Sequence, residues 1–128
     1  MRYLLDTHVL IWWLTSDKRL SVKARELITS HRNTLCWSAA STWEIAIKHA
    51  LGRLVFEESP ERLLPLELDR NHIESLVITN EHAFLAGQLP MHHKDPFDRM
   101  LVAQAQVEAI GIISNDSQFQ LYDVDVFW

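Results

Sequence analysis

A chain of 128 residues, 48% of them hydrophobic, is long enough to bury the core of one domain without cross-links. Its formal charge of −5 argues against a protein that binds nucleic acid through a broad basic surface. That exclusion weakens if several carboxylates bind cations, because the cations then cancel their charge.

Other classes are excluded by the start of the chain and by its cysteine content. The sequence enters an apolar segment at Tyr3 with no charged leader, and the apolar run at residues 9–14 is too short to span a bilayer. Cys36 is the only cysteine and has apolar neighbours, which indicates a packed thiol and no internal disulfide. We expect one soluble, cytoplasmic domain over residues 1–128, with no membrane partner.

The predicted strands and helices alternate along the chain. Strands are expected at residues 2–5, 35–37, 76–78, 112–113 and 124–127. Helices are expected at residues 7–15, 21–31, 41–51, 60–72, 81–87 and 96–109. Pro65 fits poorly inside the fourth helix, whereas Gly52 and Gly111 follow helix ends. Because several strands are apolar throughout, this order predicts an α/β fold with a parallel sheet covered on both faces.

Two aspartates follow predicted strands. Asp6 comes directly after the first strand, and Asp116 comes after the strand that succeeds the last helix. Ligands of open parallel sheets collect beyond the carboxyl ends of the strands, so both side chains are expected at one edge. For either aspartate alone, a turn or a helix N-cap is an equally good explanation.

Glu44 occupies an unusual place on its helix. A helical wheel puts it on the apolar side, which carries Ala40, Ile47 and Leu51. The structural alternative is an ion pair with Lys48, which contributes only about 0.2–0.5 kcal/mol on a helix surface. Burying an unpaired carboxylate costs roughly several kcal/mol, which favours a functional reason for Glu44.

Asp98 raises the same question in the first turn of the last helix. Asp95 and Pro96 already supply the N-cap and the first helical residue. Asp98 either adds negative charge at the helix N-terminus or serves chemistry. A wheel places it on the side of the helix that is expected to face the sheet, with Leu101, Val102, Ala105 and Ala109.

The four acids together predict a metal site. They repel one another unless a cation lies between them, and oxygen ligands without thiolates suit Mg²⁺ or Mn²⁺. One or two such ions lower the pKa of a bound water for in-line attack on phosphorus and stabilise the phosphoryl oxygens. The sequence therefore favours metal-assisted hydrolysis of a phosphodiester.

The motifs "LLDTH", "SAASTWEIAIK", "HHKDPFDRMLVAQA" and "ISND" occur in this order over nearly the whole chain. Together with "LGRL" after the glutamate helix, they resemble the PIN-domain ribonucleases, specifically the VapC-type toxins of bacterial toxin-antitoxin pairs. The resemblance implies a five-stranded parallel sheet and a Mg²⁺- or Mn²⁺-dependent endoribonuclease. It also implies an RNA substrate, inhibition by a cognate antitoxin protein, and dimers or larger assemblies.

Residue roles follow from the resemblance. The metal-binding and catalytic acids are Asp6, Glu44, Asp98 and Asp116. The residues expected to orient them are Thr7, Ser114 and Asp95, with Asp95 acting chiefly as the helix cap. The family often has threonine where Ser114 stands, and serine keeps the hydroxyl. Candidates to contact the RNA backbone are Lys48, Lys94 and Arg99, for each of which a solvated surface charge is the alternative.

Other interpretations remain open. Asp6 is also a candidate phosphate acceptor, as in aspartyl-phosphate phosphatases or phosphotransferases, although position 8 is a histidine rather than a second acid. A non-catalytic RNA- or protein-interaction module with this fold is the other alternative. Zinc binding by His92 and His93 is disfavoured because adjacent loop residues seldom share an ion. Finally, Trp12, Trp13 and Trp43 are either core residues or anchors for a partner helix.

Overall fold

The sheet of this protein has five strands, all parallel, in the order β3-β2-β1-β4-β5. The computed structural model describes residues 1–128. The strands are β1 Arg2–Leu5, β2 Thr34–Ser38, β3 Glu74–Leu76, β4 Gly111–Ile113 and β5 Val126–Phe127. Because all strands run the same way, their carboxyl ends meet at one edge, as the sequence pattern predicts.

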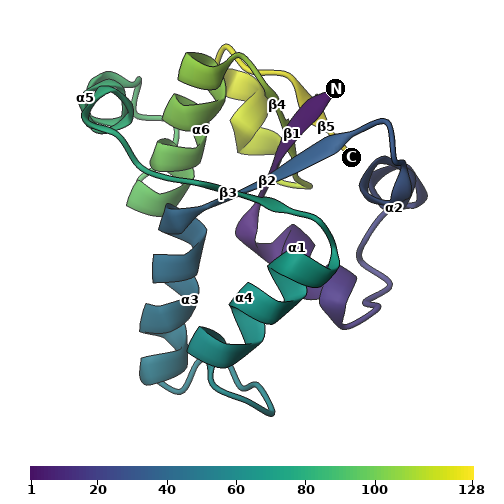
Figure 1. Ribbon diagram of the computed structural model, residues 1–128. Coiled ribbons are helices and arrows are strands. Elements are labelled where there is room, and N and C mark those ends of the chain that lie inside the picture. Colours follow the sequence, from purple (N-terminus) through teal and green to yellow (C-terminus); the bar gives the residue numbers. More distant parts are fainter.

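Helices cover both faces of the sheet (Figure 1). They are α1 Thr7–Leu14, α2 Val22–Thr29, α3 Ala39–Ala50, α4 Pro60–Arg70, α5 Asn80–Gln88 and α6 Pro96–Glu108. A short 3₁₀ helix, η1 Ser117–Leu121, follows β4. The expected α/β fold with a five-stranded parallel sheet is confirmed.

Side-chain alternation along β1 divides the core in two. Tyr3 and Leu5 belong to a cluster that includes residues of α1, α2, α3 and α4. Leu4 points the other way, into a cluster built from α5, α6 and η1. Both clusters are buried, which explains why β1 has apolar side chains on both faces from Tyr3 to Leu5.

The main differences from the expected elements lie at an edge of the sheet. β3 ends at Leu76, where the sequence pattern begins the strand, so Val77 and Ile78 lie beyond it and are exposed. An edge strand has one neighbour and needs little burial, so apolar residues alone do not define its register.

Pro65 does lie inside α4, whose buried Leu64 and Leu68 offset the lost backbone hydrogen bond. None of the helices combines the length and apolarity that a membrane crossing requires.

Candidate metal centre

The four predicted acids approach one another at the carboxyl edge of the sheet. Asp6 follows β1, Asp116 follows β4, Asp98 lies in the first turn of α6, and Glu44 lies in α3, whose N-terminus follows β2. They share an electrostatic environment, since the charges of the other three raise the pKa of Asp98. The structure thus brings together residues that are up to 110 positions apart in the sequence.

Asp6 occupies the N-cap position of α1, but its side chain forms no capping hydrogen bond. Instead, Asp6 Oδ2 accepts a hydrogen bond from Ser114 Oγ at 2.8 Å. The side chain is buried, and this burial raises the pKa of the Asp6 carboxyl above its ordinary value. A capping role therefore does not explain where this carboxylate points.

Glu44 is buried, with 4% of the residue exposed. Its Oε1 accepts a hydrogen bond from Thr7 Oγ1 at 2.7 Å, and its Oε2 is 2.5 Å from Lys48 Nζ. The ion pair with Lys48 thus exists, but on a buried carboxylate rather than on a helix surface. Thr7 and Ser114 both contact metal-binding candidates, as expected for hydroxyls that orient them.

The helical-wheel argument for Glu44 needs a correction. Ile47 and Leu51, assigned to the same buried side, are 36% and 63% exposed. The buried side of α3 instead carries Ala40, Ser41, Glu44 and Ile45. Glu44 is enclosed because α3 contacts both α1 and α6 there, a tertiary effect that the periodicity of one helix does not contain.

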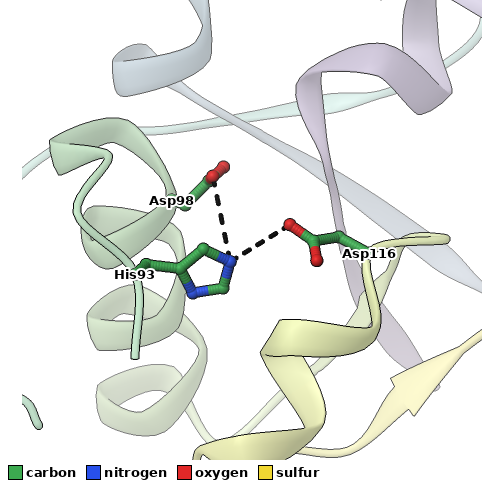
Figure 2. A group of neighbouring side chains, drawn as sticks. All are labelled: His93, Asp98 and Asp116. Carbon is green, nitrogen blue, oxygen red and sulfur yellow. Dashed lines mark hydrogen bonds and ion pairs between the residues drawn. The ribbon is translucent and has the colours of Figure 1, made fainter. Parts of the chain in front are cut away.

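Asp116 uses its two oxygens differently. Its Oδ1 accepts a hydrogen bond from the backbone N–H of Gln118 at 2.9 Å and so caps η1. Its Oδ2 lies 3.1 Å from His93 Nε2 (Figure 2). The turn-capping alternative is therefore correct for one oxygen, while the other faces the cluster.

Asp98 is the one acid of the four that accepts no hydrogen bond. His93 Nε2 lies 3.9 Å from Asp98 Oδ2, which is too far for a hydrogen bond (Figure 2). The pKa of Asp98 rises to about 8, chiefly through burial and then through the charges of Asp6, Asp95, Glu44 and Asp116. A divalent cation is the natural partner for a carboxylate in this position, because it supplies the missing charge and ligand contact.

His93 is a residue of this centre that the sequence interpretation did not include. It comes from the loop before α6, is 4% exposed, and forms with Asp98 and Asp116 a group whose ligand atoms lie within 4.8 Å of one another. Its neighbour His92 is exposed and rests edge-on against Tyr122 instead. The only available sequence signal was the closeness of this histidine to Asp95 and Asp98, because no periodicity defines where a loop side chain points.

A family model described as "PIN domain" matches residues 3–125, which is nearly the whole chain. The chain belongs to the PIN-domain family. It is 30% identical over 122 residues to "Ribonuclease VapC22" of Mycobacterium tuberculosis, an alignment that covers 91% of this chain and 88% of that protein. The resemblance to VapC-type proteins is thereby confirmed.

Solved VapBC structures share the fold of this PIN domain. VapBC2 from Rickettsia felis, solved bound to a DNA fragment from its promoter, matches with a TM-score of 0.73 and 16% identity, covering 99% of this chain and 98% of that chain. VapBC-1 from nontypeable Haemophilus influenzae matches with a TM-score of 0.70 and 19% identity, covering 99% and 97%. With PIN membership established, the aspartyl-phosphate alternative loses its basis.

The residues of this PIN domain fit a hard divalent cation. Four carboxylates converge without any thiolate, and hydroxyl donors already orient two of them: Ser114 for Asp6 and Thr7 for Glu44. Asp95 Oδ1 accepts hydrogen bonds from the backbone N–H groups of Phe97 and Asp98 at 2.8 and 3.4 Å. Asp95 is therefore the helix cap, as predicted, and fixes the turn that carries Asp98.

The tryptophans of this PIN domain divide between core and surface. Trp12 is buried, and the partly buried Trp13 donates a hydrogen bond from Nε1 to Asn71 Oδ1 at 3.1 Å. Trp43, next to Glu44, is 62% exposed and packs edge-on against Phe97, with ring centroids 5.4 Å apart. Only Trp43 thus presents a large aromatic surface to solvent beside the acids.

Arg99 corrects an expectation. Its guanidinium donates hydrogen bonds to four backbone carbonyls, those of Ala86, Leu89, Pro90 and His93, at 2.7–3.5 Å. The group ties the loop between α5 and α6 to the start of α6, so Arg99 is not the solvated surface charge given as the alternative. An RNA contact of Arg99 stays a prediction. Lys94, in contrast, is exposed, and Lys48 contacts Glu44.

Arg99→Lys is expected to lower the free energy of unfolding by about 1–3 kcal/mol, because one ammonium group cannot donate to all four carbonyls that the planar guanidinium reaches. Urea denaturation measures this difference. Lys94→Met serves as the matched control and should change stability by less than about 0.5 kcal/mol. An Arg99→Lys variant of unchanged stability but weakened RNA affinity would contradict this structural role and support the RNA contact.

Proposed function

We propose that this PIN domain is a Mg²⁺- or Mn²⁺-dependent endoribonuclease that hydrolyses RNA phosphodiester bonds as the toxin of a toxin-antitoxin pair. The main support is the convergence of four carboxylates around Asp98, which has no hydrogen-bond donor and a pKa of about 8. Further support is the 30% identity to a protein named as a ribonuclease. Acting on cellular RNA, such an enzyme works in the cytoplasm.

In this proposal, Asp6, Glu44, Asp98 and Asp116 hold one or two cations at the carboxyl edge of the sheet. A bound divalent cation supplies an activated water nucleophile and stabilises negative charge on the phosphoryl oxygens. Ser114 and Thr7 fix the orientations of Asp6 and Glu44 through their hydroxyls. The Lys48 ammonium offsets part of the negative charge beside Glu44, and the exposed Lys94 is available to the RNA backbone.

We also propose a cognate antitoxin protein as the partner, and a homodimer as the assembled toxin. Structures that share this fold include one described as a toxin-antitoxin complex from Klebsiella pneumoniae and VapBC2 bound to a DNA fragment from its promoter. The exposed Trp43 beside the acids is an apolar side chain that such a partner would cover. Which RNA is cut depends on the loops and surface charges of the protein around the site rather than on the four acids.

The test combines cleavage with metal binding. The purified chain should cut single-stranded RNA in Mn²⁺ or Mg²⁺ and stop when EDTA is added. Mn²⁺ alone should raise the Tm, since a ligand at about 100 times its Kd stabilises the folded state by about 2.7 kcal/mol. A chain that shows neither cleavage nor a Tm shift, yet still binds a partner, would be a non-catalytic interaction module instead.

A further inference from the structure

His93 is a buried polar residue at the metal centre that the proposed function does not yet use. It lies in the loop between α5 and α6, and its ring points toward the gap between Asp98 and Asp116 (Figure 2). A buried imidazole placed between two carboxylates needs a structural reason, because polar rings are rarely enclosed without a specific contact.

The ring is held in place by contacts that do not involve the acids. The backbone N–H of His93 donates a hydrogen bond to Tyr122 Oη at 2.8 Å. The imidazole stacks on the Tyr122 ring, with centroids 5.5 Å apart and an interplanar angle of 10°, and also contacts the Phe119 ring at 4.9 Å. Since Arg99 donates to the His93 carbonyl, backbone and ring are fixed without help from the acids.

The two ring nitrogens have different surroundings. Nε2 lies 3.1 Å from Asp116 Oδ2 and 3.9 Å from Asp98 Oδ2. Nδ1 is buried and has no hydrogen-bond partner. A hydrogen on Nδ1 would lack an acceptor, whereas a hydrogen on Nε2 has Asp116 Oδ2 as an acceptor at 3.1 Å, so the hydrogen belongs on Nε2.

We propose that His93 is a positioning residue of the metal centre, whose Nε2–H holds the Asp116 carboxylate beside Asp98 so that both acids bind one divalent cation. This inference rests on the proposed function. It extends a pattern already present in the site, because Asp6 has Ser114 and Glu44 has Thr7 as a donor. With Gln118 N–H on Oδ1 and His93 on Oδ2, both oxygens of Asp116 have fixed directions.

The decisive variants are His93→Leu, which removes the donor, and His93→Gln, whose side-chain amide supplies an N–H at a similar reach. Mn²⁺ affinity of the full chain is measured by isothermal titration calorimetry. We expect His93→Leu to bind Mn²⁺ about 10–100-fold more weakly than the unmodified chain, as for other partners that orient metal ligands. His93→Gln should stay within about threefold, because it restores the hydrogen bond that this role requires.

A second measurement does not depend on whether His93→Leu folds. Nitrogen-15 NMR of the unmodified chain should find the His93 hydrogen on Nε2 without metal, and still there after saturation with diamagnetic Mg²⁺. A direct metal ligand would lose this hydrogen when the ion binds, and that result would overturn the positioning role.

The same role is overturned by a folded His93→Leu variant that binds Mn²⁺ normally, or by a His93→Gln variant as weak as His93→Leu. These results are distinguishable from failure of the proposed function. If the proposed function fails, the unmodified chain itself binds no Mn²⁺ and cleaves no RNA.

Discussion

Replacing Asp98 with asparagine is expected to abolish metal-dependent RNA cleavage while making the metal-free protein more stable. Asparagine keeps the size of the side chain and removes its charge. The proposed cation then loses a ligand, and activity should fall by at least about 10²–10³-fold, the loss typical of removing one electrostatic contact to the reacting groups. Stability rises because a partly buried carboxylate that accepts no hydrogen bond no longer faces the charges of Asp6, Asp95, Glu44 and Asp116.

Both effects are measurable on the same preparation. RNA cleavage in Mn²⁺ measures the loss of activity, and thermal unfolding in EDTA at pH 8 measures the gain in stability. In a domain of this size, each kcal/mol of stability shifts the Tm by roughly 3–6 °C. Asp123→Asn is the matched control, since Asp123 is exposed between η1 and β5 and should change neither quantity. A folded Asp98→Asn variant that still cleaves RNA with Mn²⁺ would refute the role of Asp98.

The metal-free protein should also lose stability as the pH rises from about 5 to 8. The pKa of Asp98 is about 8 in the folded protein and close to its ordinary value of 3.8 in the unfolded chain. Between these values the folded state holds a proton that the unfolded state has released, so the free energy of unfolding falls with increasing pH. Burial raises the pKa of Asp6 as well, which acts in the same direction.

Thermal unfolding across this pH range tests the prediction. In EDTA, the Tm should be lower by about 5 °C or more at pH 8 than at pH 5, and Asp98→Asn should flatten this slope. Excess Mn²⁺ should remove most of the loss at pH 8, because the cation takes the place of the proton. If the Tm in EDTA instead rises from pH 5 to pH 8, and rises equally in the unmodified chain and in Asp98→Asn, then the pKa of Asp98 is not raised in the folded protein.

The convergence of the acids could be predicted from sequence because it follows from topology. Once Asp6 and Asp116 end parallel strands, both must lie at the same edge of the sheet. The Asp95 cap and the start of α6 at Pro96 could be predicted equally well, because Asp-Pro is a local helix-start signal. These features depend on neighbours in the sequence or on strand direction alone.

The remaining features depend on packing between distant segments. His93 points at the acids because Tyr122 and Arg99 hold its loop, and neither contact leaves a periodic pattern in the sequence. Arg99 looks like a surface cation until its four carbonyl partners are known. In α3, the contacts with α1 and α6 decide that Glu44 is buried while Ile47 stays partly exposed.

The hydrogen bond between Ser114 and Asp6 joins residues 108 positions apart and depends on the pairing of β1 with β4. During translation, the first acid therefore leaves the ribosome long before the strand that completes its surroundings. A growing chain has no assembled centre until β4 and Asp116 have emerged and docked beside β1. If the proposed function holds, an unfinished chain would therefore lack the complete metal centre that cleavage requires.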